Sequence, residues 1–411
     1  MTDRLYYHDS FLYNFDAEVC SLVESPRPAV ILDRTAFYPT SGGQIFDTGW
    51  IAPADPAAGP GARLRVTEVA DADDGHVIHY LEAPLKGLQP GTRVRGEIDT
   101  NRRRDHMQQH SAQHVLSAAF VRLFNMPTVS FHMADEYCSI DLDSPSLSKE
   151  QVESAERLAN EIILENRPVD LRFVTRDEAA TLGLRKLPLT ERDQLRLIDI
   201  HDFDLTACGG THVNRTGQIG GICLRRTEKV RQGYRVEFVA GGRAVATARR
   251  DFNTLTEIAA LFSAHIYDGP QHARKSLDEI RSLRKQIEQS QDELAAAQAA
   301  TLLAETPESH GRKLVVRTFS DRDLNFLKLL GQKLTRQSPA VIALLATESP
   351  QPALVFAQSA GQPHDMGKLL KETMAKLGGR GGGSKDLAQG GAPTAQGLDA
   401  ALTAAAQFLS R

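Results

Sequence analysis

Two short histidine-containing motifs constrain the fold of this chain more than any other feature of its sequence. His110 and His114 lie four residues apart in a stretch of helical periodicity, so their side chains share one face of a helix. Cys208 and His212 follow much later, in a glycine-bearing turn. Three imidazoles and a thiolate form a nitrogen and sulfur ligand set that suits zinc. The sequence therefore predicts one zinc site that joins two distant parts of a domain.

A third histidine, His106, lies one turn before His110 and leaves the choice of helical ligands open. The row from His106 to His114 spans eight residues, about 12 Å at about 1.5 Å per residue. Because Zn–N bonds are about 2 Å long, the two outer histidines cannot bind the same ion. Spacing alone therefore predicts that one neighbouring pair of the three histidines binds the metal.

Composition places the chain among ordinary globular proteins. Its 411 residues suffice for two or three domains, and 41% hydrophobic with 24% charged residues exclude disordered and fibrous classes. No apolar run approaches the roughly 18 residues of a membrane span, and the first residues lack a signal-peptide pattern. Four scattered cysteines do not make a disulfide framework: Cys20, Cys138, Cys208 and Cys223. We therefore expect a cytoplasmic protein without a membrane partner.

Residues 1–100 and 101–242 have different patterns. The first part alternates short strand-like runs with Pro, Gly and Asp clusters, which favours a small antiparallel barrel or sandwich. Within it, Gly42 and Gly43 let the backbone approach a ligand closely, although such a pair is more often a simple turn. The second part mixes both kinds of element and is expected to be α+β, with helices near 101–125 and 148–166 and strands near 137–142, 169–175 and 195–200.

The remaining residues suggest a helical linker, 243–306, and an α/β domain, 307–411. Within the second linker helix, Ile280, Ile287 and Leu294 repeat every seven residues. The second core position of each heptad is polar at Arg284 and Gln291. A coiled coil here would therefore have only one of its two apolar positions in these heptads. A helical hairpin that bridges domains or supports a homodimer fits equally well.

Two basic stretches are candidates for phosphate contacts. Arg225, Arg226 and Arg235 belong to a basic segment that follows the cysteine turn, although such a segment can also be a solvated face. Arg380 and Lys385 lie in a glycine-rich stretch, 378–391, between two expected helices. We expect this stretch to be a loop whose backbone donors bind phosphate or RNA, with a flexible linker as the alternative.

Three motifs together resemble the free-standing alanyl-tRNA editing proteins of the long form. They are Thr35–Gln44, Arg103–His114 and the Cys208-Gly209-Gly210-Thr211-His212 turn. This family is similar to the editing domain of alanyl-tRNA synthetase, and the glycine-rich stretch resembles the C-terminal domain that the long forms share with that synthetase. Because no aminoacylation domain precedes Met1, charging of tRNA and a need for ATP are not expected.

The resemblance implies a ligand set and a substrate. One Zn²⁺ per chain would be held by His110, His114, Cys208 and His212, which leaves His106 out. The reaction would be hydrolysis of mischarged Ser-tRNA(Ala), with Gly-tRNA(Ala) as a second candidate, so tRNA(Ala) is the expected partner. The hydroxyl that faces the substrate falls at Ser130, with Thr128 as the alternative.

Elementary chemistry explains why such a site needs a polar side chain that recognises the hydroxyl of the substrate's amino acid. Alanine is smaller than serine and enters any pocket that serine enters, so selection must depend on the serine hydroxyl. A site that hydrogen-bonds a hydroxyl can reject the analogue without it by roughly 10⁴–10⁵-fold, against about 10–200-fold for a methyl-sized difference. We expect Ser130 and Gln44 to face that hydroxyl, with Gly42 and Gly43 beside them.

The other residues of the motifs are expected to lie around the ion or toward the RNA: His106, Gly209, Gly210 and Thr211. No side-chain nucleophile is expected once Cys208 is a ligand. Four protein ligands describe a closed site and three with water an open one, and the sequence does not choose between them. The competing hypotheses are a tRNA-binding module without catalysis and an editing hydrolase for another mischarged tRNA, such as Ser-tRNA(Thr).

The expected architecture is therefore α+β and multidomain. It comprises a small N-terminal β-barrel (1–100), an α+β zinc-containing editing domain (101–242), a helical hairpin or coiled-coil linker (243–306) and a C-terminal α/β domain with a glycine-rich loop (307–411).

Overall fold

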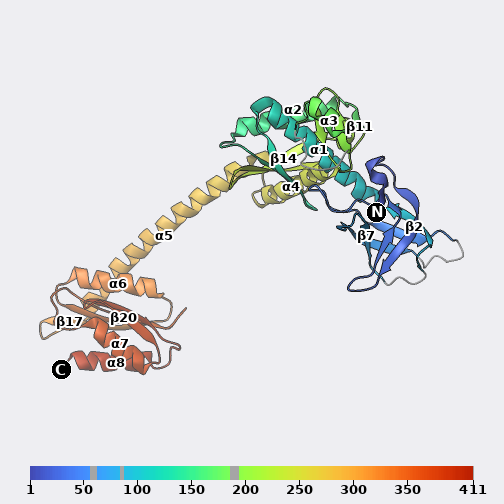
Figure 1. Ribbon diagram of the computed structural model, residues 1–411. Helices are drawn as coiled ribbons and strands as arrows, with labels where there is room; N and C mark the ends of the chain where they lie inside the picture. Colours follow the sequence, from blue (N-terminus) through green and yellow to red (C-terminus); the bar gives the residue numbers. More distant parts are fainter. Residues whose placement is uncertain (56–62, 84–87, 186–193, 411) are drawn as a thin grey trace. The chain divides into compact units, whose positions relative to one another are not determined.

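The computed structural model describes residues 1–55, 63–83, 88–185 and 194–410 (Figure 1). It divides the chain into two compact units, Met1–Glu257 and Ile258–Arg411. Among the described residues, no helix is both long and apolar enough to cross a membrane.

The N-terminal part of the first unit is a closed six-stranded barrel, as the alternating pattern predicted. The strands run in the order β2-β3-β7-β6-β5-β8, and alternate residues such as Phe15, Ala17 and Val19 point into its core. A short parallel pair, β1 (Asp3–Arg4) with β4 (Arg34–Thr35), accompanies the barrel. The barrel strands are β2 (Asn14–Val23), β3 (Ala29–Leu32), β5 (Gly49–Pro53), β6 (Leu64–Asp71), β7 (Val77–Leu81) and β8 (Arg93–Ile98).

A long helix, α1 (Thr100–Phe124), follows the barrel and matches the helix expected near 101–125. Asp99 caps its start by accepting a hydrogen bond from the Arg102 backbone N–H, and Asn125 ends it in the left-handed conformation. With α2 (Lys149–Leu164) it packs on an antiparallel sheet of order β14-β15-β10-β9. These strands are β9 (Thr128–Met133), β10 (Cys138–Leu142), β14 (Ile222–Val230) and β15 (Gly233–Ala240).

A second, three-stranded sheet brings the cysteine motif to this helix. Its order is β11 (Val169–Thr175), β12 (Gln194–Ile200) and β13 (Asp204–Ala207), with α3 (Arg176–Thr181) after β11. Because β13 ends at Ala207, Cys208 lies directly at the end of a paired strand. The helix α4 (Gly241–Leu261) begins immediately after β15.

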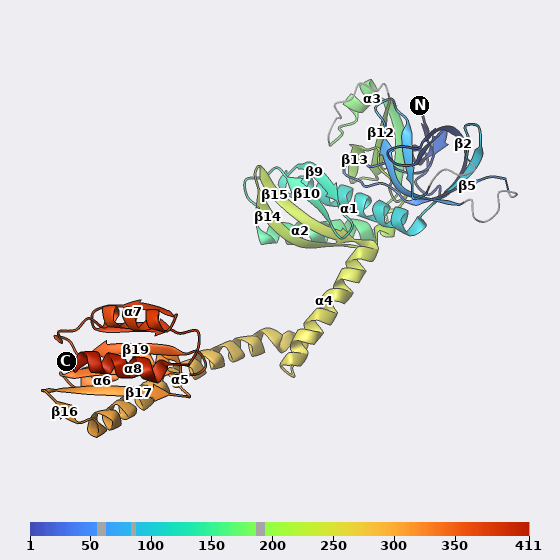
Figure 2. The same ribbon diagram turned by 90° about the horizontal axis from the view of Figure 1, so that it is seen from below.

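The second unit is built on a six-stranded mixed sheet of order β16-β17-β18-β19-β21-β20. The helix α6 and the end of α5 pack on one face, while α7 and α8 pack on the other (Figures 1 and 2). The elements are α5 (Gly269–Glu305), β16 (Glu308–Ser309), β17 (Arg312–Phe319), α6 (Leu324–Gln337), β18 (Val341–Thr347), β19 (Ala353–Gln358), α7 (Met366–Lys376), β20 (Arg380–Gly383), β21 (Leu387–Gly391) and α8 (Leu398–Leu409).

The glycine-rich stretch is a β-hairpin at the edge of this sheet, which corrects the expectation of a loop. Arg380 pairs with Gly391 and Gly383 with Ala388. Glycine is needed because the hairpin lies directly against its neighbours: a Cβ at Gly381 would come within 3.0 Å of the Leu370 side chain. Composition alone therefore indicated a flexible or ligand-binding loop where close packing requires glycine.

Candidate metal centre and substrate cavity

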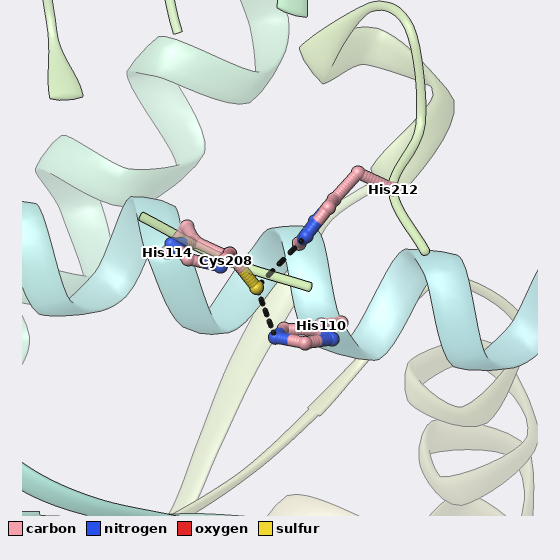
Figure 3. A group of neighbouring side chains, drawn as sticks. All are labelled: His110, His114, Cys208 and His212. Carbon is pink, nitrogen blue, oxygen red and sulfur yellow. Dashed lines mark hydrogen bonds between the residues drawn. The ribbon is translucent and has the colours of Figure 1, made fainter. Parts of the chain in front are cut away.

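The four side chains of the two motifs converge in the first unit. The ligand atoms of His110, His114, Cys208 and His212 all lie within 4.8 Å of one another (Figure 3). The Cys208 sulfur lies 3.4 Å from His110 Nε2 and 3.3 Å from His212 Nε2. The two histidine rings on α1 stack with their centroids 5.2 Å apart. This group could hold one metal ion.

Local structure explains how the motifs meet. His110 and His114 lie on the buried face of α1, one turn apart, and Cys208 begins the turn that follows β13. The turn passes so close to the helix that a Cβ at Gly210 would overlap the His110 ring. Glycine at this position therefore permits the approach.

Two of the histidines are oriented by partners on their outer sides. His110 Nδ1 lies 2.7 Å from Gln44 Oε1, an atom that can only accept, so His110 donates and turns Nε2 to the cluster. His212 Nδ1 lies 3.5 Å from the Ser111 hydroxyl, which also accepts a hydrogen bond from the Val213 backbone N–H. Such outer partners fix the ring orientation of a metal-binding histidine.

The third histidine has a buried ring nitrogen that a metal ion could use. His114 Nε2 is buried and has no hydrogen-bond partner among the described residues. On the other side of the ring, Nδ1 lies 3.8 Å from Asp204 Oδ2 and 3.4 Å from Arg185 Nη2. An unpaired buried nitrogen is costly, whereas a bound cation would use its lone pair. The donor set of three nitrogens and one sulfur fits zinc.

The electrostatics favour a thiolate at Cys208 and neutral imidazoles at His110 and His212, whereas the pKa of His114 is raised, because Asp204 and Cys208 together outweigh the lowering effect of burial. Burial alone would raise the pKa of the Cys208 thiol, but the neighbouring His110 and His212 imidazoles lower it well below its usual value. Burial lowers the pKa of His212 to about 3. A thiolate and neutral imidazoles are the forms that bind a divalent metal.

The position of Gln44 corrects the expectation that it faces a substrate hydroxyl. Its side chain is fully buried behind His110. Besides His110, its Oε1 accepts from the Thr211 backbone N–H at 3.1 Å, and its Nε2 donates to the Thr211 hydroxyl at 2.9 Å. Gln44 therefore holds the histidine and the cysteine turn together, and it is not among the residues that line the cavity beside the cluster.

His106 lies outside the cluster and is fully buried, so the alternative of an RNA-facing residue does not fit its position. Its Nδ1 lies 3.9 Å from Asp47 Oδ1, and neither ring nitrogen has a hydrogen-bond partner among the described residues. Burial, with Arg102 adding to it, lowers the pKa of His106 to about 2. The imidazole is therefore neutral in the folded chain.

A cavity of about 480 Å³ opens beside the cluster. Thr128 and Ser130, the two candidates for recognising a substrate hydroxyl, both line it from strand β9. Gly43 lies just behind this strand, where its carbonyl accepts a hydrogen bond from the Met133 backbone N–H at 3.0 Å. The lining includes Gly42, His110, Gln113, His114, Thr128, Ser130, Phe131, Cys208 and Gly209.

The candidate phosphate-binding arginines of the first unit are paired with carboxylates. Arg225 binds Asp251, and the Arg226 guanidinium lies 3.2 Å from Glu228. Arg235 binds Asp141 through two N–H groups, at 2.7 and 2.9 Å. In the second unit, the hairpin carries its two basic residues, Arg380 and Lys385, on an exposed surface.

Several residues of the site were missed by sequence reasoning. Arg196, from β12, donates to the carbonyls of Cys208 and Gly210 at 2.7 and 2.9 Å, and to the Tyr7 carbonyl at 2.9 Å. It thereby ties the cysteine turn to the beginning of the chain. Ser111 could have been suspected because it lies between the motif histidines, whereas no local signal marks Arg196, Asp141 or Asp204.

Three family models match: "tRNA synthetases class II (A)" over residues 7–102, "Threonyl and Alanyl tRNA synthetase second additional domain" over 195–236 and "DHHA1 domain" over 313–411. The second model includes the cysteine motif and the third includes the glycine-rich hairpin.

Similar proteins fall into two groups. Alanine–tRNA ligases from Methanothrix thermoacetophila and Pyrococcus furiosus are 31% and 32% identical over 98% and 95% of this chain. The chain spans only 44% and 42% of their lengths. The alanyl-tRNA editing protein AlaX-L of Pyrococcus horikoshii is 30% identical, over 95% of this chain and 94% of that protein. The chain therefore belongs to the family of the long alanyl-tRNA editing proteins, AlaX-L.

Proposed function

We propose that this chain hydrolyses the ester bond of mischarged Ser-tRNA(Ala), with Gly-tRNA(Ala) as a second candidate substrate. The observation that carries the proposal is the buried histidine–cysteine cluster beside a cavity lined by two hydroxyl side chains, Thr128 and Ser130. Near-full-length similarity to a protein named for alanyl-tRNA editing supports the same assignment.

The proposed reaction adds water across the ester, releasing the amino acid and leaving a hydroxyl on the terminal ribose of the tRNA. His110, His114, Cys208 and His212 would hold one Zn²⁺ ion. When bound, the ion supplies a Lewis acid that orients the aminoacyl end and weakly polarises water. We propose water as the nucleophile because Cys208 is engaged by imidazoles and the Ser130 hydroxyl donates to a carboxylate.

The cavity residues would select the substrate. Gly42 and Gly209 allow the chain to approach the ribose closely, since neither adds a side chain to the cavity. The hydroxyl side chains on β9 would pair with the serine hydroxyl, and alanine would leave them unpaired. Unpaired buried polar groups are the source of strong discrimination at such sites.

We assign tRNA binding to basic residues of both units and self-association to α5. Arg225, Arg226, Arg380 and Lys385 are the proposed phosphate contacts, and Arg235 contributes only if it leaves Asp141. The exposed apolar residues Ile280, Ile287 and Leu294 of α5 are the proposed homodimer surface. The proposed functional parts divide at residues 100, 242 and 306, and ATP has no role in the proposed reaction.

The test of metal-dependent catalysis uses Cys208→Ala with Cys20→Ala as its matched control, because Cys20 is exposed on barrel strand β2. We expect wild type and Cys20→Ala to deacylate Ser-tRNA(Ala) and to contain about one zinc per chain. Cys208→Ala, and wild type treated with chelator, should lose zinc and activity together. Undiminished tRNA binding without any deacylation would instead establish a binding module, and faster hydrolysis of Ser-tRNA(Thr) would establish a different editing specificity.

A further inference from the structure

An exposed aromatic pair lies on the first unit, outside the cavity. The centroids of the His8 ring and the Phe173 ring are 5.2 Å apart, and Phe173 belongs to strand β11. His8 is exposed, and Phe173 is 41% exposed, although phenylalanine is usually among the buried residues. The pair therefore presents aromatic surface to the solvent.

The strand register places Phe173 on the face of its sheet that meets the cysteine turn. Phe173 pairs directly with Arg196 on β12. Directly opposed residues on neighbouring antiparallel strands place their side chains on the same face. The Arg196 guanidinium donates to the carbonyls of Cys208 and Gly210, at 2.7 and 2.9 Å. The Phe173 ring therefore lies on the side of the sheet that faces this turn.

The chain segment that carries His8 connects the aromatic pair to the cavity. Arg196 Nε donates to the carbonyl of Tyr7, the residue before His8, at 2.9 Å. The Tyr7 side chain reaches Gly209, where a Cβ would lie 3.6 Å from the Tyr7 hydroxyl. Gly209 in turn lines the cavity beside the histidine–cysteine cluster. A long ligand that leaves the cavity past Gly209 is therefore brought to Tyr7 and to the neighbouring pair of rings.

We propose that Phe173 and His8 form a stacking platform for the unpaired nucleotides at the acceptor end of the tRNA. This inference rests on the proposed function, because an ester on the terminal ribose enters the cavity with the unpaired end of the RNA behind it. Bases of a single strand stack on aromatic side chains whatever their identity, since every base has a π-face. The Arg196 guanidinium bonds only to carbonyl oxygens among the described residues, so its positive charge favours an anionic strand here.

The first test compares Phe173→Ala with Phe252→Ala, the matched control, because Phe252 is another phenylalanine of the first unit and is 49% exposed on α4. Loss of a stacking ring should raise KM for Ser-tRNA(Ala) by about 5–100-fold and leave kcat within about twofold. Hydrolysis of seryl ethyl ester, which carries no base, should change by less than about twofold. Phe252→Ala should match wild type with both substrates, and the conservative Phe173→Tyr variant should retain most of the affinity for the tRNA.

A second measurement does not depend on hydrolysis. A fluorescent adenine analogue replaces each of the last two bases of uncharged tRNA(Ala) in turn, and stacking on an aromatic side chain quenches its fluorescence. We expect wild type to quench the analogue in at least one of these positions, and Phe173→Ala to lose that quenching at protein concentrations that saturate the tRNA. If Phe173→Ala fails to fold, His8→Ala, at an exposed residue, should reduce the quenching and raise KM for Ser-tRNA(Ala).

The outcomes separate the platform from the function on which it rests. Wild type that hydrolyses neither Ser-tRNA(Ala) nor seryl ethyl ester would overturn the proposed function. An active wild type in which Phe173→Ala changes KM for Ser-tRNA(Ala) by less than about twofold, or raises KM equally for the small ester, would overturn the platform and leave the function standing. Equal quenching by wild type and Phe173→Ala would also overturn the platform, whether or not the protein is active.

Discussion

At the scale of single residues, the candidate metal ligands are oriented by side chains that are not themselves candidate ligands. Gln44 contributes no ligand atom, yet its amide oxygen determines which nitrogen of His110 faces Cys208. In the same way, the Ser111 hydroxyl lies next to Nδ1 of His212, on the side of the ring away from Cys208. The orientations of these two histidine rings are therefore set by residues near the barrel and on α1.

Gln44→Ala is predicted to weaken zinc binding without removing a ligand. Loss of the Oε1 acceptor frees the His110 ring to rotate, which should reduce zinc affinity by about 10–100-fold. Competition titration with a chromophoric chelator measures the effect. Gln89→Ala, at an exposed glutamine of the barrel, should bind zinc like wild type. Equal affinities for Gln44→Ala and wild type would refute the orienting role.

The buried His79 of the barrel predicts a pH dependence of stability. Its Nδ1 donates to the Val30 carbonyl at 3.1 Å, and its Nε2 accepts from the Thr35 hydroxyl at 2.8 Å. Phe37 packs against its ring. Burial lowers the pKa of His79 from 6.5 to about 4. Between these values the unfolded chain binds a proton that the folded barrel does not.

The free energy of unfolding should therefore fall as the pH decreases from about 6.5 to about 4, by about 2–3 kcal/mol from this residue. Urea unfolding followed by the fluorescence of Trp50, the sole tryptophan and part of β5, reports on the barrel. A His79→Gln variant should unfold more easily at neutral pH but with a flatter pH dependence. The same pH slope in both proteins would contradict the assignment.

Local spacing revealed the two motifs, because histidines four residues apart and a Cys-x-x-x-His turn are visible within a few residues, but only the family resemblance chose His110 and His114 over His106. Local spacing did not reveal the role of Gln44, since its contact with His110 joins positions 66 residues apart. The pairing of Asp141 with Ser130 depends on strand register, which a short strand without a marked turn leaves open.

At the scale of elements, the glycine-rich hairpin of the second unit contains two kinds of glycine: those required by close packing and those with free space around them. Several of its glycines face α7 or the paired strand, where a side chain has no room, whereas a Cβ at Gly382 would meet nothing within 4 Å. Composition alone does not distinguish these two kinds of glycine. The helix prediction succeeded where the hydrophobic periodicity was clear, as in α2, and the loop prediction failed here because glycine carries no hydrophobic periodicity.

Gly383→Ala and Gly382→Ala form a matched pair on β20. The added methyl group at Gly383 would overlap the backbone of Leu387 and Ala388, so we expect a loss of about 1–3 kcal/mol in the stability of the second unit. The same change at Gly382 should alter stability by less than about 0.5 kcal/mol. Hydrogen exchange of the amides in β21 measures both. Equal protection in the two variants would show that the hairpin is not packed as described.

At the scale of the whole molecule, the two compact units suggest a division between chemistry and RNA capture. The proposed reaction requires the barrel, α1 and the cysteine turn, all of which belong to Met1–Glu257. The exposed Arg380 and Lys385 belong to the other unit. Truncation therefore tests whether the proposed hydrolysis and the proposed tRNA binding belong to different units.

Removal of residues 306–411 is predicted to weaken tRNA binding while leaving hydrolysis of a small seryl ester within about twofold of wild type. The site retains its own hydrophobic cores in the first unit. Filter binding with tRNA(Ala) and hydrolysis of the small ester are measured on the same preparation. Equal loss of both activities would show that the second unit is required for the folded site.

The most direct test of the central claim is the ratio of kcat/KM for Ser-tRNA(Ala) to that for Ala-tRNA(Ala), measured with the zinc-loaded full chain. Because Thr128 and Ser130 line the cavity and alanine has no hydroxyl to pair with them, we predict a ratio of at least about a hundred. A ratio near one, or hydrolysis of neither substrate by protein that holds its zinc, would contradict it.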